Sequence, residues 1–127
     1  MATVHIGLTY PDLIAHIAPG DLAERAERWG FHTLWVTDHA LKARLDPLVL
    51  LAAVSQRTRR LRLGTGVLIP SNRIAPVAAN AFASLNKLAP GRIDIGIGTG
   101  FTGRRAMGMG AIKLAAFEEY IRIMTAL

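Results

Sequence analysis

Four glycines follow an apolar segment in residues 92–103, which read RIDIGIGTGFTG. Glycine has no Cβ and tolerates positive φ, so the backbone of such a loop can come close to a ligand. A parallel strand that runs into a glycine-rich loop is typical of the carboxyl edge of an α/β sheet, where these proteins bind ligands. The stretch therefore predicts a small-molecule site, although Gly96 and Gly98 are also explained by crowding where a strand packs tightly.

Two other apolar segments end in residues that can do chemistry. Asp38 and His39 follow the segment at residues 33–37, and Gly66 and Val67 lie in the segment at residues 61–69. Histidine titrates closer to neutrality than other side chains and can relay a proton, while an aspartate can orient it. Asp38 could instead cap the segment that follows it. If the strands are parallel neighbours, their carboxyl ends converge on one rim.

Alternating elements must position these residues. The sequence predicts strands at residues 4–9, 33–37, 61–69 and 93–97, and helices at residues 21–30, 46–57, 75–88 and 113–127. Four such βα units demand parallel pairing with right-handed crossovers. Two architectures fit, an open doubly wound sheet or consecutive units of a (β/α)8 barrel. Because a complete barrel needs about 250 residues, the chain would hold only the first half of one.

A dinucleotide site is disfavoured, although residues 98–103 match the pattern G-x-G-x-x-G. That fingerprint requires a helix that begins inside the motif and an acidic residue at the end of the next strand. Gly108 and Gly110 predict a long loop after the motif, and Glu118 and Glu119 fall within a predicted helix. The motif also follows the fourth strand, whereas the fingerprint usually follows the first.

Composition narrows the class of protein. The 127 residues predict one domain over residues 1–127, with 51% hydrophobic and 19% charged residues. The absence of cysteine fits a reducing cytoplasm. No run of 18 apolar residues predicts a membrane span, and the amino terminus lacks a basic leader, so we expect neither a membrane protein nor a signal peptide.

The net charge of +6 invites a nucleic-acid interpretation, which the pattern does not favour. Arg57, Arg59 and Arg60 end a predicted helix, where cations complement the helix dipole. Aromatic residues make up 6% of the chain and do not interleave with the basic ones. We therefore expect no nucleic-acid partner. The histidines show no metal-ligand spacing, so no metal site is expected.

Taken together, these strand ends resemble the bacterial luciferase-like monooxygenase family, including its deazaflavin-dependent reductase branch. The matching stretches are residues 30–39, 46–48, 61–67 and 91–100. Residues 103–110 resemble the subgroup that is similar to methylenetetrahydromethanopterin reductase. The resemblance implies the first four βα units of a TIM (β/α)8 barrel, a half-barrel with strands in the order 1-2-3-4. It also implies a flavin or deazaflavin ring over the carboxyl ends of the strands.

The resemblance assigns roles to particular residues. It implies Asp38 and His39 as the catalytic pair near the ring. It implies that the ring-binding residues are Asp38, Gly66, Val67, Thr99 and Gly100. Relatives carry a cis peptide that is not prolyl at the place of Gly66 and Val67. The cofactor phosphate is held in this family by loops late in the barrel, which this stretch lacks, so affinity for a free flavin is expected to be weak.

The expected function is that of an oxidoreductase that uses FMN or a deazaflavin coenzyme of the 8-hydroxy-5-deazaflavin type on a small-molecule substrate, here in a truncated form. One alternative is a half-barrel without catalysis, whose open strand edges and exposed apolar inner face would cause it to form a homodimer, to self-associate in another way, or to pair with a complementary half. The other is a doubly wound domain that binds a nucleotide.

Overall fold

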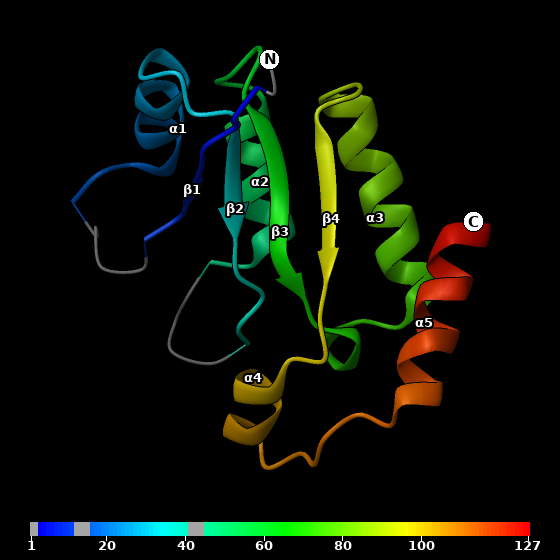
Figure 1. The fold of residues 1–127 in the computed structure, drawn as a ribbon. Coiled ribbons are helices and arrows are strands. Elements are labelled where there is room, and N and C mark those ends of the chain that lie inside the picture. The colour runs from blue at the N-terminus through cyan, green and yellow to red at the C-terminus, as the bar shows by residue number, and fades with distance from the viewer. Residues whose placement is uncertain (1–2, 12–15, 41–44) are drawn as a thin grey trace.

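Four parallel strands form one sheet in the computed structural model of the chain, which describes residues 3–11, 16–40 and 45–127 (Figure 1). The strands are β1 (Gly7–Thr9), β2 (Thr33–Val36), β3 (Arg62–Leu68) and β4 (Ile93–Ile97). Their spatial order is β1-β2-β3-β4 and every pair is parallel. This order confirms the partial barrel and contradicts the doubly wound sheet, in which the first strand lies between others.

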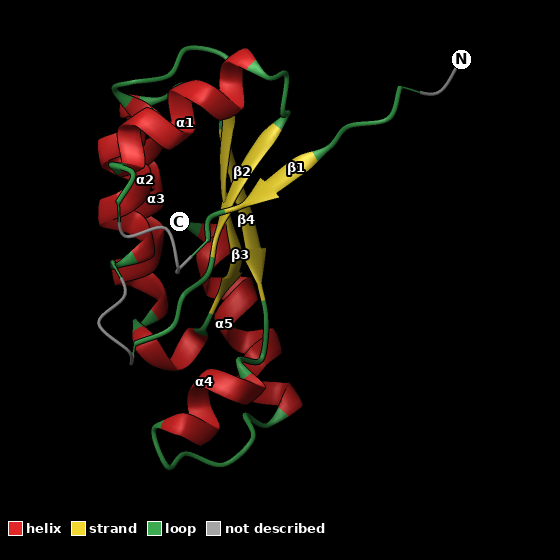
Figure 2. Ribbon diagram, turned by 90° about the vertical axis from the view of Figure 1, so that its left-hand side faces the viewer, coloured by secondary structure: helices red, strands yellow, loops and turns green. Residues whose placement is uncertain are grey.

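Helices cover one face of this sheet. Helices α1 (Pro19–Arg28), α2 (Pro47–Ser55) and α3 (Ala75–Leu88) lie on the same side of the strands (Figure 2). Helix α5 (Leu114–Ala126) packs beside α3, and α4 (Phe101–Ala106) lies beyond the carboxyl ends of the strands (Figure 1). Within the described residues, no helix combines the length and the hydrophobicity needed to cross a bilayer.

Local signals in the sequence explain where the helices begin and end. The Asp46 carboxylate accepts hydrogen bonds from the N–H groups of Leu48 and Val49, and Pro47 occupies the first position of α2. This is the preferred order of cap and proline at a helix start. Gly30 follows the end of α1 with a φ of 84°, the left-handed conformation that glycine favours after a helix.

The core lies between the sheet and helices α1 to α3. Leu34 and Leu63 are paired on neighbouring strands and point toward the helices, where both are fully buried. Leu51 and Val54 of α2 and Phe82 of α3 meet them from the other side. Burial of such side chains contributes roughly 1.5–3 kcal/mol each. The sheet is therefore fixed from its helix-covered face.

The opposite face of the sheet is less apolar than the half-barrel interpretation expected. Trp35 lies across it, so close to Gly7 that a Cβ added there would lie 2.6 Å from the indole Nε1 atom. On the neighbouring strands, Arg62 and Asp94 form an ion pair with Nη2 and Oδ1 2.5 Å apart. The prediction of an exposed apolar inner face is wrong, because indole, glycine and charged side chains occupy these alternate strand positions.

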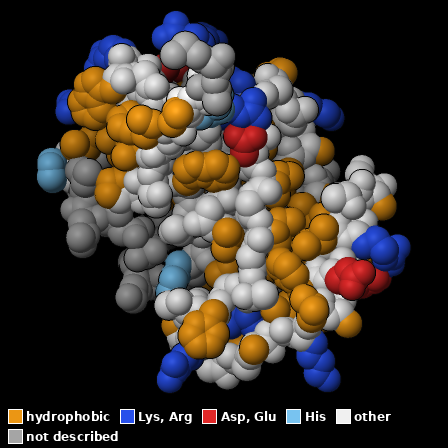
Figure 3. All heavy atoms as spheres, viewed as in Figure 1, with side chains coloured by type: hydrophobic (Ala, Val, Ile, Leu, Met, Phe, Trp, Pro, Cys, Tyr) orange, Lys and Arg blue, Asp and Glu red, His pale blue; other side chains and the backbone are white. Residues whose placement is uncertain are grey.

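Exposed apolar side chains gather instead beside β4. Ile95 is 46% exposed. A groove of about 350 Å³ runs between β4 and α5, and its lining includes Ile95, Ile97, Ile121 and Met124. Figure 3 shows hydrophobic side chains gathered in this region, toward α5. The unpaired edge of β4, rather than the face of the sheet, is thus the apolar surface that the fold leaves open.

Most predicted boundaries differ from the structure by one or two residues, and two predictions differ by more. The first strand begins at Gly7 rather than residue 4, and Val4 and Ile6 before it are exposed, because β2 pairs only with residues 7–9. The predicted long loop after Gly103 is also wrong, since α4 begins inside the glycine motif. Gly100, with a φ of 68°, starts this helix, and Gly108, with a φ of 73°, follows its end.

Candidate functional site

A cavity of about 390 Å³ lies at the carboxyl edge of the sheet. It is lined by residues 37–39 after β2, by residues 66, 67 and 69 at the end of β3, and by residues 98–103 after β4. The six candidate residues predicted from the sequence all belong to this lining: Asp38, His39, Gly66, Val67, Thr99 and Gly100. The three strand ends therefore converge on one rim. The roles of the six residues stay predictions.

Close packing explains the glycines of this rim. A Cβ on Gly98 would lie 2.6 Å from the Cγ2 atom of Val67, and one on Gly100 would overlap the side chain of Ile69. The Gly98 N–H donates to the Leu68 carbonyl at 3.1 Å. The loop after β4 thus rests directly on the end of β3, which requires residues without a Cβ. The same glycines therefore relieve crowding against β3 and line the cavity.

The peptide bond between Gly66 and Val67 is cis, the conformation that the resemblance implies at this position. The register between β3 and β4 also shifts between Thr65 and Leu68. Val67 is 38% exposed and lines the cavity. The wall of the cavity is formed by an irregular piece of strand rather than by a regular pleat.

The Asp38 carboxylate is buried and engaged with the chain itself. Its Oδ2 atom accepts a hydrogen bond from the Ile69 N–H at 3.0 Å and lies 3.5 Å from Nη1 of Arg73. The Asp38 N–H donates to the Val67 carbonyl at 3.2 Å. The alternative that Asp38 caps the segment after it involves residues 41–44, which lie outside the described residues. Among the described residues, the carboxylate contacts Ile69 and Arg73, about thirty residues further along the chain.

His39 presents the least satisfied polar group of the cavity. Its Nδ1 atom is buried and, within the described residues, has no hydrogen-bond partner. A buried polar atom without a partner costs about 1–3 kcal/mol. Asp38 therefore does not orient the imidazole through Nδ1. The ring retains hydrogen-bonding capacity for a molecule in the cavity.

Apolar and hydroxyl groups complete the lining. Ile69 and Val67 form one wall, and Phe101, 67% exposed, stands at the start of α4. Thr99 and Thr102 are exposed. Sequence reasoning missed Ile69, two residues after Val67, and Phe101, which follows Gly100. A mostly apolar lining with a few polar groups is what small-molecule sites share.

Further buried polar groups surround the short 3-10 helix η1 (Pro70–Asn72). The Ser71 hydroxyl, both side-chain polar atoms of Asn72 and the Tyr120 hydroxyl lack partners among the described residues. The pKa of the Tyr120 phenol is raised, mainly by burial. Nearby Arg73 lowers this pKa and nearby Asp38 raises it. Neither Asn72 nor Arg73 lines the cavity at the carboxyl edge.

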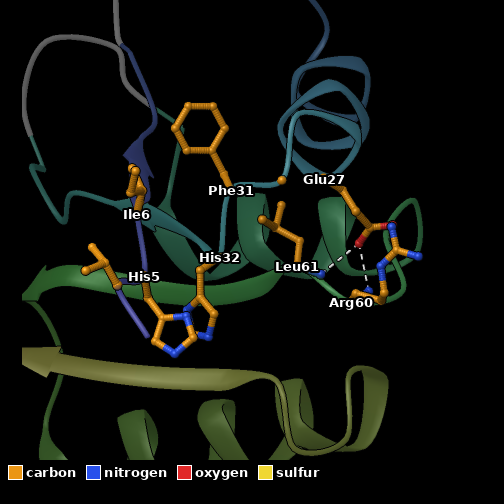
Figure 4. Close-up of a pocket in the computed structure, with 9 residues that line it drawn as sticks. His5, Ile6, Glu27, Phe31, His32, Arg60 and Leu61 are labelled. Carbon is orange, nitrogen blue, oxygen red and sulfur yellow. Dashed lines mark hydrogen bonds between the residues drawn. The ribbon is translucent and has the colours of Figure 1, made fainter. Parts of the chain in front are cut away.

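A second cavity, of about 350 Å³, lies at the opposite, amino edge (Figure 4). The rings of His5 and His32 face each other there, with centroids 4.0 Å apart. Glu27 is committed to structure, because its carboxylate accepts the N–H groups of residues 59, 60 and 61. Within the described part of the chain no group of three or more metal-binding side chains forms. The carboxyl edge is therefore the stronger candidate.

Several of the basic residues are paired with acidic ones. Arg57 contacts Asp21 and Glu24, and Arg122 contacts Glu119 on α5. Three N–H groups of Arg92 donate to the Thr58 hydroxyl and to the backbone carbonyls of residues 55 and 61, in a position where burial lowers the arginine pKa. These residues serve the fold and do not form a free basic surface.

Parallel strands in sequence order, helices on one face and a cavity at the carboxyl ends define the first half of a (β/α)8 barrel. Comparison with known proteins identifies the family of barrels to which the chain belongs. The profile of the family described as luciferase-like monooxygenase matches residues 17–127, and the chain belongs to that family.

Relatives and solved structures agree with this assignment. The F420-dependent glucose-6-phosphate dehydrogenase of Kineococcus radiotolerans is 43% identical over 103 residues, which cover 73% of this chain and 31% of that protein. Monooxygenase RslO1 from Streptomyces bottropensis is 28% identical, with a TM-score of 0.76 and coverage of 95% of this chain and 42% of that one.

The coenzyme F420-dependent tetrahydromethanopterin reductase of Methanopyrus kandleri is also 28% identical, with a TM-score of 0.73. It is matched over 86% of this chain and 31% of its own. The chain spans less than half the length of each of these three proteins.

Proposed function

We propose that the cavity at the carboxyl edge binds the ring of a deazaflavin or of FMN, and that the chain supplies the ring-binding part of an oxidoreductase. The observation that carries the proposal is the convergence of three strand ends on one cavity. The residues that line it include each position that matches the ring site of the family. The proposal includes the cytoplasmic location that the sequence predicts.

The lining fits a planar heterocycle with polar edges. The volume of about 390 Å³ falls in the range of small-molecule sites, roughly 300–1,000 Å³. Val67, Ile69 and Phe101 supply apolar contact, while the unpartnered Nδ1 atom of His39 and the Thr99 hydroxyl supply hydrogen bonds. An amphipathic ring satisfies both kinds of group at once.

Each residue then has a task in the proposed chemistry. A bound deazaflavin supplies hydride transfer, and a bound reduced flavin supplies reaction with oxygen. His39 holds or relays a proton at its ring nitrogen beside the substrate. Val67 and Ile69 exclude water from one side of the cavity, and Thr99 hydrogen-bonds to the polar edge of the ligand. Asp38 holds the wall in place.

A deazaflavin is the favoured cofactor. The relative that is 43% identical is named an F420-dependent dehydrogenase, and F420 is a deazaflavin. The match to a protein named a monooxygenase is more distant, at 28% identity. FMN therefore remains the second candidate. The substrate is proposed only as a small organic molecule.

Titration of the purified chain with F420 and with FMN tests this proposal through quenching of cofactor fluorescence. We expect saturable binding, tighter for F420. Thr99→Phe adds bulk to the cavity at an exposed side chain and should raise the Kd at least tenfold. Val77→Phe, at an exposed position of α3, is the matched control and should leave the Kd unchanged. No saturable binding of either cofactor would refute the proposal.

A second candidate function rests on the open edge of β4. We propose that a second copy of this chain covers the apolar groove between β4 and α5. An unpaired strand edge beside exposed isoleucines favours association with another sheet. The first strand, β1, forms the other edge of the sheet, so two copies have complementary parallel edges. Association of this kind is compatible with ring binding at the carboxyl edge.

A further inference from the structure

Arg73 lies between two carboxylates that come from different parts of the fold. Its Nη1 atom is 3.5 Å from Oδ2 of Asp38, which follows β2, and its Nη2 atom donates to Oδ2 of Asp46. The side chains of Arg73 and Asp38 are only 17% and 4% exposed. A planar guanidinium with several donors is suited to bridge two carboxylates in this way.

The Asp38 end of this bridge holds the wall of the cavity. Oδ2 of Asp38 accepts the Ile69 N–H, and the Asp38 N–H donates to the Val67 carbonyl. Val67 and Ile69 both line the cavity, and His39 is the next residue after Asp38. The position of Asp38 therefore determines where the wall and the imidazole lie relative to each other.

The Asp46 end of the bridge belongs to the start of α2. Oδ1 of Asp46 accepts the N–H groups of Leu48 and Val49, while Oδ2 is left for Arg73. Because α2 is packed in the core, Asp46 gives Arg73 a fixed anchor. Arg73 thus connects a rigid helix start to the buried carboxylate that supports the cavity.

We propose that Arg73 is a positioning residue for the ring site. It acts on His39, Val67 and Ile69 through Asp38 and does not itself line the cavity. The effect of Arg73 on cofactor binding rests on the proposed function. Its effect on the position of Asp38 rests on the hydrogen bonds alone. Loss of the guanidinium would leave the Asp38 charge buried without its cation, so we expect the carboxylate to move from its place beside Ile69.

The first test needs no cofactor. Amide hydrogen exchange reports whether the Ile69 N–H stays bonded to Asp38. In Arg73→Met we expect protection of the Ile69 amide to fall at least tenfold, while protection of the Leu63 amide in β3, bonded to the Arg92 carbonyl, stays within twofold. Equal losses at both amides would show a purely structural role, and no loss at Ile69 would also overturn the inference.

The second test measures binding of F420. Arg73→Met should raise the Kd at least tenfold, Arg73→Lys should restore part of the affinity, and Arg122→Met, which removes an exposed pair on α5, should leave it unchanged. Asp46→Asn keeps an oxygen to cap α2 and loses the charge that anchors Arg73, so it serves if Arg73→Met does not fold. Its expected effects are a raised Kd and lower Ile69 protection.

The two tests separate the inference from the proposed function. If the unaltered chain binds no F420 while Arg73→Met still loosens Ile69 alone, the proposed function fails and the positioning role stands. If F420 binds and every Arg73 variant binds equally well, the positioning role fails and the proposed function stands.

Discussion

The imidazole of His39 combines a place on the cavity wall with a buried nitrogen that has no partner among the described residues. Folding alone does not favour this arrangement, because an unpartnered polar atom away from water lowers stability. Residues that break a local rule in this way are expected at functional sites. The cost in stability and the proposed benefit in binding can be measured on the same variant.

Replacement of His39 by leucine separates the cost in stability from the proposed benefit in binding. His39→Leu keeps a similar volume and removes the unpartnered nitrogen, so we expect the free energy of unfolding to rise by about 1 kcal/mol. The same variant should bind F420 more weakly, as fluorescence titration would show. His16→Leu, at an exposed histidine, should change neither quantity. A loss of stability in His39→Leu would contradict the account of Nδ1.

The sequence pointed to residues of the carboxyl-edge cavity where the signal was local, and the roles of these residues stay predictions. Glycines after an apolar run, and Asp38 and His39 at a strand end, are visible in single stretches of chain. The partners of Asp38 are not, since Ile69 and Arg73 lie 31 and 35 residues further along. Only the packing of β2 beside β3 brings these groups together, and no spacing in the sequence indicates it.

At the scale of elements, the loop that joins β4 to α4 depends on a glycine at position 100. Gly100 has a positive φ of 68°, and a Cβ added to it would overlap the side chain of Ile69. Helix α4 begins at the next residue, although the glycines around it predicted a loop. Helix propensity is a weak guide here, because the start of α4 is determined by how β4 packs on the end of β3.

Gly100→Ala tests this dependence. The new methyl group meets the Ile69 side chain and the backbone is strained at positive φ, so we expect a loss of about 2–4 kcal/mol in the free energy of unfolding. Gly110→Ala is the matched control, since it has no neighbour within 4 Å and no positive φ. Urea denaturation measures both. Equal stability of the two variants would contradict the packing argument.

The contact between α1 and the turn before β3 predicts a pH dependence. Burial raises the Glu27 pKa. Hydrogen bonds from the N–H groups of Leu61, Arg60 and Arg59 lower it by more than burial raises it, so the net pKa lies below its ordinary value. A carboxylate with a lowered pKa adds stability above its unfolded-state pKa and loses it as pH falls through the folded-state pKa.

Glu27→Gln should therefore lower the free energy of unfolding at pH 7 by about 1–2 kcal/mol. The difference from the unaltered chain should shrink as pH falls below about 4, where Glu27 itself becomes protonated. Glu24→Gln removes only an exposed partner of Arg57 and should have no measurable effect. A difference that is independent of pH would exclude the charged form as the cause.

At the scale of the whole molecule, the order of the strands was predictable from the alternation of elements together with the family resemblance. Four βα units of regular length leave few arrangements, and the sequence resemblance selected the barrel. What the sequence did not indicate is where the open surface lies. Strand alternation predicts which residues share a face, but it does not show that Trp35 covers the inner face of the sheet or that α5 leaves a groove beside β4.

The open groove predicts self-association. Sedimentation velocity of the chain at micromolar concentration should show a dimer. Ile95→Lys places a charge on the exposed edge of β4 and should shift the protein to monomer, whereas Val77→Lys, 53% exposed on α3, should not. A monomeric unaltered chain, or a dimer that tolerates Ile95→Lys, would contradict a role for this surface.

The ring site is tested most directly by the side-chain resonances of the four histidines during titration with F420. His39 lines the carboxyl-edge cavity, while His5 and His32 lie together at the amino edge and His16 is exposed. The imidazole signals of His39 should shift progressively and saturate, and those of His5, His16 and His32 should stay in place. Saturating shifts at His5 and His32, with none at His39, would show that the ligand binds at the other end of the molecule.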